Sequence, residues 1–92
     1  MSRPTDGPCA VYFIKHRDTD EMLYIGISND PNGRIAIHHY NHAHWTHEPY
    51  EVAVEWYDNR ADARAAEAFA IDLHAPRDNK QHRPTGPRRR AS

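Results

Sequence analysis

Two short segments near the start of the chain have the composition of adjacent β-strands. Residues 9–15 read Cys-Ala-Val-Tyr-Phe-Ile-Lys and residues 21–28 read Glu-Met-Leu-Tyr-Ile-Gly-Ile-Ser, and both are rich in β-branched and aromatic side chains. The polar link between them, residues 16–20, is short enough for a hairpin, so we expect the two strands to pair antiparallel. This pairing would bring Tyr12 and Tyr24 side by side.

A helix and a third strand are expected next. Asn29 or Asp30 can cap the backbone N–H groups of a helix that begins near Pro31, a residue suited to the first helical position, and runs to about residue 42. Residues 50–57 then alternate valine or tryptophan with glutamate or alanine, and this period of two predicts a strand.

An alanine-rich stretch, residues 60–74, predicts a second helix that Pro76 ends. Its apolar stripe comprises Ala63, Ala66, Ala70 and Leu73, with Glu67 and Phe69 beside it. The order β-β-α-β-α predicts an α+β fold, in which helices flank a three-stranded, mainly antiparallel sheet.

A chain of 92 residues supports one domain with a small core. We expect the domain at residues 9–82, after a flexible N-terminus at residues 1–8 and before a basic, disordered tail at residues 83–92. Cys9 is the only cysteine, which excludes an intramolecular disulfide and a zinc site made of thiolates. No apolar run is long enough to span a membrane, so a cytoplasmic protein without a membrane partner is expected.

The net charge of −1 conceals an uneven distribution of charge. Residues 1–76 carry six Lys or Arg against twelve Asp or Glu, whereas residues 77–92 carry six against one. An acidic body repels phosphate at long range, so any nucleic-acid site needs local positive charge from the tail, a metal ion or a partner.

Six residues on the expected strands and helices carry a spacing that resembles a known signature. They are Tyr12, Tyr24, Gly26, Arg34, His38 and Glu67. Tyr12 ends an Ala-Val-Tyr triplet, Gly26 ends a Leu-Tyr-Ile-Gly segment, and Arg34 lies eight residues after Gly26 and four before His38. Together the set resembles the signature of the GIY-YIG nuclease superfamily over residues 10–79.

The resemblance implies a role for each polar member of the set. Tyr12 or Tyr24 would orient or deprotonate the attacking water, Arg34 would grip the scissile phosphate, and His38 would serve the phosphate site. Glu67 would hold one divalent ion, Mg²⁺ or Mn²⁺, because magnesium prefers oxygen ligands and keeps several waters. A glutamate beside an alanine-rich stripe also needs a cation on physical grounds, since an unpaired buried carboxylate is costly.

Three further residues are candidates for substrate binding. Gly26 ends the second strand, where the absence of a side chain permits close approach. His47 is a candidate second acid or phosphate contact, and Asn79 matches the late asparagine of the family, which resembles a tie between the chain end and the sheet.

Two features leave alternatives open. The histidines at positions 38, 39, 42, 44 and 47 lie within ten residues, and a pair such as His38 and His42 could bind zinc. The run Arg88-Arg89-Arg90 either tracks phosphates or only solubilises the chain.

The leading hypothesis is a metal-dependent endonuclease that cuts DNA, with branched, flapped or nicked structures among its candidate substrates. The alternative is a catalytically weak nucleic-acid-binding module within a larger complex. The acidic body favours it, as does Ile27, which stands where several members carry a polar or basic residue. A protein partner or a homodimer is compatible with either hypothesis.

Overall fold

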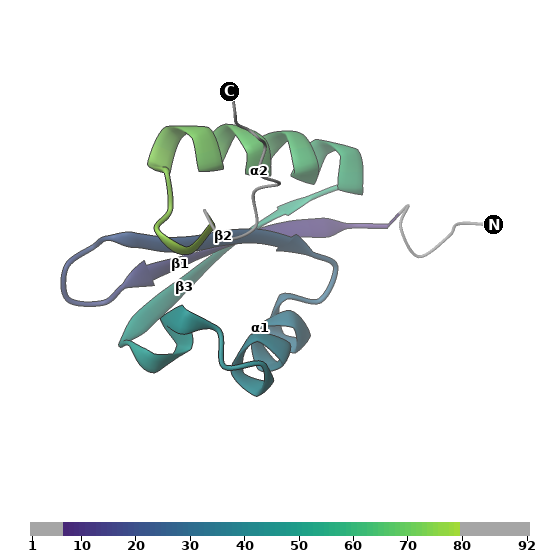
Figure 1. Cartoon of the computed structure of the whole chain (residues 1–92). Coiled ribbons are helices and arrows are strands. Elements are labelled where there is room, and N and C mark those ends of the chain that lie inside the picture. The colour runs from purple at the N-terminus through teal and green to yellow at the C-terminus, as the bar shows by residue number, and fades with distance from the viewer. Residues whose placement is uncertain (1–6, 80–92) are drawn as a thin grey trace, which may run out of the picture.

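The computed structural model describes residues 7–79, in which a three-stranded sheet lies between two helices (Figure 1). The elements in chain order are β1 (Cys9–His16), β2 (Met22–Ser28), α1 (Pro31–Tyr40), the short 3-10 helix η2 (His44–His47), β3 (Tyr50–Tyr57) and α2 (Arg60–His74). The predicted α+β class and the order β-β-α-β-α are therefore confirmed, and η2 is an element that the sequence did not predict.

The sheet has β1 at its centre and the order β2-β1-β3, with both pairings antiparallel. Tyr12 pairs with Gly26 and Ile14 pairs with Tyr24, which confirms the predicted hairpin. A bulge after Ile14 shifts the register. Because side chains alternate between the faces of a strand, Tyr12 and Tyr24 lie on the same face.

Each face of the sheet has its own small core. On the α2 face, Cys9 and Val11 of β1 pack with Ile25 of β2 against Ala63 and Ala70. The small alanines let the helix approach the sheet closely.

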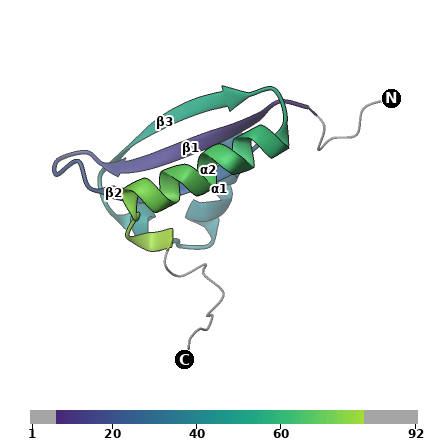
Figure 2. The ribbon, with the colours of Figure 1, turned by 90° about the horizontal axis from the view of Figure 1, so that it is seen from above.

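On the α1 face, Tyr12 and Leu23 pack with Trp45 of η2, and Ile35 of α1 is partly buried against them. Viewed from above, α2 lies along the β1 and β2 side of the sheet and leaves β3 uncovered (Figure 2).

The uncovered edge strand changes the interpretation of two predicted apolar patterns. Val52, Val54 and Trp56 do alternate along β3, but all three are exposed because neither helix covers this strand, and Trp56 is 56% exposed. Leu73 was predicted on the apolar stripe of α2, and that placement is wrong. Its side chain is 65% exposed, because the buried side of the helix is defined by the smaller alanines.

Capping residues fix both helix starts. The Asp30 carboxylate accepts a hydrogen bond from the Gly33 amide at 3.2 Å, with Pro31 at the first helical position, and the Asn59 side chain accepts one from the Asp62 amide at 2.8 Å. Helix α1 ends at Tyr40, two residues before the predicted end. Neither helix in this part of the chain is long and apolar enough to cross a membrane.

Some sequence predictions concern residues outside the described range of 7–79. These are most of the N-terminal segment at residues 1–8, the whole basic tail at residues 83–92, and the arginine run within that tail. They stay predictions.

Candidate active site

Tyr12 reaches from the central strand across β2 to helix α1. Its side chain is 1% exposed, and its hydroxyl lies 3.0 Å from His38 Nε2. A Cβ atom at Gly26 would lie 2.5 Å from this hydroxyl, so the ring can cross β2 only where that strand has a glycine. Gly26 does permit the close approach that was predicted, but Tyr12 makes it, and Gly26 itself is buried.

Trp45 holds Tyr24 and His38 in one aromatic cluster. The centroids of the Tyr24 and His38 rings are 5.0 Å apart in an edge-to-face arrangement, and the ring of Tyr12 lies 6.0 Å from that of Tyr24. Trp45 stacks on Tyr24 at 6.1 Å and meets His38 edge-on at 5.2 Å. Contacts of this kind restrict the orientation of both rings. Sequence reasoning missed Trp45, and its only signal was one large aromatic residue among the histidines.

A cleft of about 260 Å³ opens beside this cluster. Its lining residues are Tyr24, Arg34, Ile37, His38, Asn41, Ala43, His44, Trp45 and Asp78. Tyr24 thus faces the cleft, whereas Tyr12 is buried. Arg34 and His38 lie one turn apart on α1, and the exposed Arg34 side chain reaches the same cleft.

Burial controls the protonation of both tyrosines. It raises the pKa of Tyr12 well above its ordinary value, with Tyr24 and Glu67 adding to the rise and Arg34 opposing it. Burial raises the pKa of Tyr24 as well, although a hydrogen bond with Tyr12 and the charge of Arg34 act against it. The charge of Arg34 therefore lowers both pKa values, as expected, but burial outweighs it. Both hydroxyls are protonated at neutral pH.

The negative charge of Glu67 on α2 adds to the raised pKa of both tyrosines, although Glu67 does not line the cleft beside Tyr24. Glu67 is half-buried, and within residues 7–79 its carboxylate has no hydrogen bond or ion pair. Burial raises its pKa, although Arg64 and Arg60 pull the pKa down. A half-buried carboxylate without a bonded partner fits a bound cation, and one carboxylate is enough for a Mg²⁺ ion that keeps water and takes a phosphate oxygen.

No group of three or more His, Cys, Asp or Glu side chains in the described part of the chain could hold a metal ion. The predicted zinc pair of His38 and His42 is also separated by its contacts. His38 bonds to Tyr12, while the ring of His42 stacks on that of His47 at 6.3 Å. The zinc alternative therefore has no support in this geometry.

The family model of the GIY-YIG catalytic domain matches residues 8–82. The chain belongs to the GIY-YIG family. No curated protein and no solved structure matched the chain significantly. Membership implies a nuclease-type function in general and a nucleic acid as substrate, and nucleases of this family generally use divalent metal ions.

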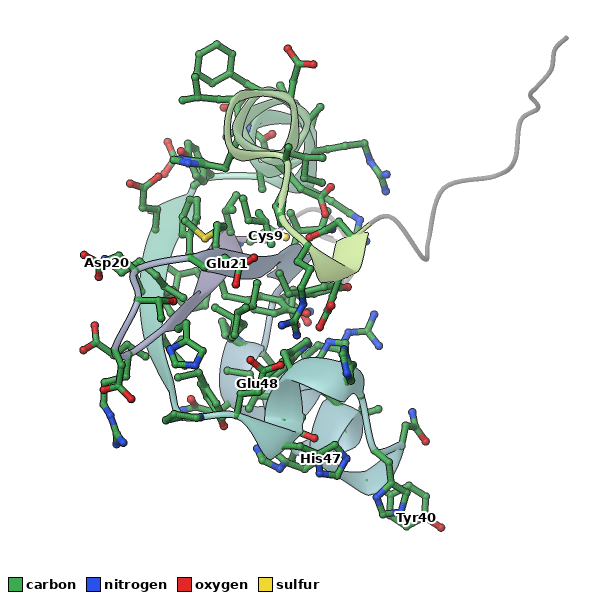
Figure 3. The ribbon with its side chains drawn as sticks, turned by 60° about the vertical axis from the view of Figure 1, so that its left-hand side comes forward. Cys9, Asp20, Glu21, Tyr40, His47 and Glu48 are labelled. Atoms are coloured by element: carbon green, nitrogen blue, oxygen red, sulfur yellow. The ribbon has the colours of Figure 1, made fainter. Side chains whose placement is uncertain are left out.

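Two predicted site residues lie apart from the cleft of this GIY-YIG domain. His47 is exposed on η2, where its ring stacks on that of His42 (Figure 3), and it lines neither cleft that Arg34 lines. Asn79 is buried, and its side chain accepts a hydrogen bond from the Ile25 amide at 2.7 Å and donates one to the Ile25 carbonyl at 2.9 Å. This asparagine closes the free edge of β2, which fits the structural tie between the chain end and the sheet that the resemblance implies.

A charged network that sequence reasoning missed anchors the chain after α2. The guanidinium of Arg77 donates to Asp78 at 2.8 Å and to both carboxylate oxygens of Glu48, which follows η2 (Figure 3). The hydrogen bond from Arg77 lowers the pKa of Glu48. Asp78 is 4% exposed and lines the cleft, so the network joins the end of the GIY-YIG domain to the loop that carries Trp45.

Proposed function

We propose that this GIY-YIG domain is a metal-dependent endonuclease that hydrolyses DNA phosphodiester bonds. The observation that carries the proposal is the hydrogen bond between Tyr12 and His38 behind a cleft lined by Tyr24, Arg34 and His38. Glu67, whose charge acts on both tyrosines, supplies the carboxylate. We also propose that the domain cuts nicked, flapped or branched DNA and that it acts in the cytoplasm.

Arg34 is the group that binds the scissile phosphate. Its planar fork of N–H donors matches phosphate oxygens, and its charge stabilises the negative charge that grows on them in the transition state. Because Arg34 is exposed at the cleft, a DNA backbone can reach it without rearrangement of the sheet.

The proton of the attacking water leaves through the two hydroxyls to His38. Both tyrosines are neutral at neutral pH, so neither is the final proton acceptor. For the transfer, the Tyr12 O–H turns from Tyr24 to His38, which lets Tyr24 donate to Tyr12. The water oxygen forms a bond to phosphorus, and its proton passes to the Tyr24 hydroxyl as that hydroxyl gives its proton to Tyr12. Tyr12 gives its own proton to His38 Nε2, 3.0 Å away. The bond from phosphorus to the 3′-oxygen breaks, and this oxygen leaves with the bonding pair and takes a proton from solvent.

Glu67 would hold the divalent ion, which when bound would supply positive charge at the phosphate. The raised pKa of Glu67 is consistent with this role, because a cation restores the charged form that burial disfavours.

A second candidate function is a nucleic-acid-binding module with little activity. The charge of residues 1–76, with six Lys or Arg against twelve Asp or Glu, favours this candidate because it weakens attraction to DNA. Both functions use the same cleft, so only measured cutting separates them.

The test is cleavage of end-labelled linear, nicked and branched DNA in Mg²⁺, in Mn²⁺ and in EDTA. We expect metal-dependent cutting that falls by about 10²-fold or more in Arg34→Ala and in Glu67→Ala. Arg17→Ala is the matched control, because Arg17 is exposed and pairs with Asp18 in the β1–β2 hairpin. DNA binding without cutting of any substrate would favour the second candidate and overturn the first.

A further inference from the structure

The described part of the chain separates its cations into two groups. Lys15, Arg17 and Arg77 each form an ion pair with a carboxylate. Across residues 7–79, Arg34, Arg60 and Arg64 have no carboxylate within 4.0 Å. In this part of the chain, the guanidinium groups without a carboxylate partner are therefore those of α1 and of the first turns of α2.

Two of these groups meet at a second cleft, distinct from the one beside Tyr24. This cleft measures about 290 Å³ and lies where the end of β2 meets α1 and α2. Its lining residues are Ile27, Ser28, Asn29, Asp30, Gly33, Arg34, Ile37 and Arg60. Arg34 lines both clefts, so it forms the boundary between them.

Arg60 is held at this cleft by its surroundings. It follows Asn59, which caps α2, and its guanidinium lies 3.9 Å from the Sγ atom of Cys9. Cys9 is buried where β1 begins, between the sheet and α2 (Figure 3). This contact places the Arg60 guanidinium beside the start of β1.

Charge in the second cleft favours an anion. Two guanidinium groups repel each other when they face one space, and an oxyanion between them removes that repulsion. The one carboxylate in the lining, Asp30, caps α1 through the Gly33 amide and offsets one of the two positive charges. The cleft therefore keeps an excess of positive charge in a chain whose body is acidic.

We propose that Arg60 and Arg34 bind a nucleic-acid phosphate in this second cleft, next to the phosphate that is cut. The inference rests on the proposed function, because it assigns the scissile phosphate to the first cleft. It identifies the substrate as a polynucleotide whose backbone continues past Arg34 toward α2, and it gives the acidic domain the local positive charge that backbone binding requires. No base enters this contact, so it contributes affinity and register without sequence specificity.

The test measures DNA affinity against salt in EDTA, where no cutting occurs, with circular dichroism as a check of folding. Loss of one phosphate contact lowers the slope of log K against log salt by about 1, so Arg60→Ala should bind several-fold more weakly at 50 mM salt and converge with wild type at high salt. Arg60→Lys keeps the charge and should keep the slope. Arg17→Ala should match wild type, because its partner Asp18 already neutralises that charge.

The outcomes distinguish this inference from the proposed function. An unchanged slope in Arg60→Ala overturns the inference, and metal-dependent cutting by wild type then leaves the proposed function standing. A reduced slope without cutting by any variant supports the phosphate site and overturns the endonuclease. Absence of salt-dependent DNA binding by wild type overturns the inference.

Discussion

Gly26 lies where the Tyr12 ring crosses β2, so the addition of one methyl group at this position should disturb the ring. An alanine there would place its Cβ atom 2.5 Å from the Tyr12 hydroxyl and 2.6 Å from Cζ, in a buried site without room to adjust. We expect Gly26→Ala to lower the free energy of unfolding by about 1–3 kcal/mol and to break the bond between Tyr12 and His38.

Urea denaturation and a cleavage assay together measure both effects. Gly7→Ala is the control, because a Cβ atom at Gly7 would meet nothing within 4 Å. Wild-type stability and activity in Gly26→Ala would show that the Tyr12 ring does not need this crossing.

The bond between Tyr12 and His38 predicts that their contributions to catalysis are not independent. If both residues serve one proton path, Tyr12→Phe and His38→Ala should each lower the single-turnover rate by about 10²-fold or more. The double variant should then be little slower than either single variant, because either change alone already interrupts the path.

Tyr50→Phe provides a matched control, since Tyr50 makes a similar bond to His39 Nε2 at 2.7 Å on the exposed side of the domain. Multiplicative losses in the double variant of Tyr12 and His38 would contradict a shared path.

At the scale of elements, Arg77 determines how stability depends on pH. The hydrogen bond from Arg77 lowers the pKa of Glu48. Burial alone would raise the pKa of Asp78, but the hydrogen bond and charge of Arg77 outweigh it and the pKa is lowered. Both carboxylates are therefore more acidic in the folded state, so their stabilisation is present above about pH 4 and is lost as pH falls through the folded values.

Arg77→Ala should lower the free energy of unfolding at pH 7 by about 2 kcal/mol, because it leaves the buried Asp78 carboxylate with only His44 beside it. The difference from wild type should shrink as the pH is lowered toward 3, where the carboxylates are protonated. Urea denaturation at a series of pH values measures this, with Arg17→Ala as an exposed control expected to change stability by less than about 1 kcal/mol. Parallel curves for wild type and Arg77→Ala across this range would exclude the network as the cause.

Local patterns in the sequence predicted most of the elements. The hairpin, the cap of α1 and the third strand follow from turn residues, a capping side chain and a period of two, all of which act within a few residues. The exposure of β3 was not predictable in this way, because alternation shows that a strand has two faces but not whether a helix covers one of them. Leu73 was misplaced for a similar reason, since helix α2 rotates its alanines and not its largest apolar residues toward the sheet.

Predictions about the site depended on contacts of longer range. Spacing predicted that Tyr12, Tyr24, Arg34 and His38 come together, and the structure brings them to one cleft or directly behind it. Trp45, Arg60 and Arg77 were missed because each joins segments that are distant in sequence, and a residue type alone does not show which of these contacts form. His47 lines neither cleft that Arg34 lines, because its ring stacks on that of His42, and its contact with substrate stays a prediction.

At the scale of the whole molecule, exposed apolar side chains form one surface on β3 and another on the outer side of α2. The exposed Val52, Val54 and Trp56 side chains follow the free edge of β3, whereas Phe69 and Leu73 project outward from α2. The two clefts that Arg34 lines lie on the β2 side instead. Among residues 7–79, neither Arg34 nor Arg60 pairs with a carboxylate. Partner binding at either apolar surface would leave DNA free to enter the cleft, and the expectation of a protein partner or homodimer stays a prediction.

Glu67 is the residue on which the account of metal-dependent cutting depends most. It is the half-buried carboxylate whose charge reaches both tyrosines, and among residues 7–79 nothing bonds to it. Glu67→Gln keeps the size of the side chain and removes the charge that burial disfavours, so the metal-free variant should be at least as stable as wild type.

The most direct test is the single-turnover cleavage of labelled DNA by Glu67→Gln and wild type in Mg²⁺, with Glu51→Gln on exposed β3 as the matched control. We predict that wild type and Glu51→Gln cut at equal rates, that EDTA stops both, and that Glu67→Gln is slower by about 10²-fold or more while it remains folded. Cutting by Glu67→Gln at the wild-type rate, or cutting by wild type that continues in EDTA, would contradict a catalytic site built around this carboxylate.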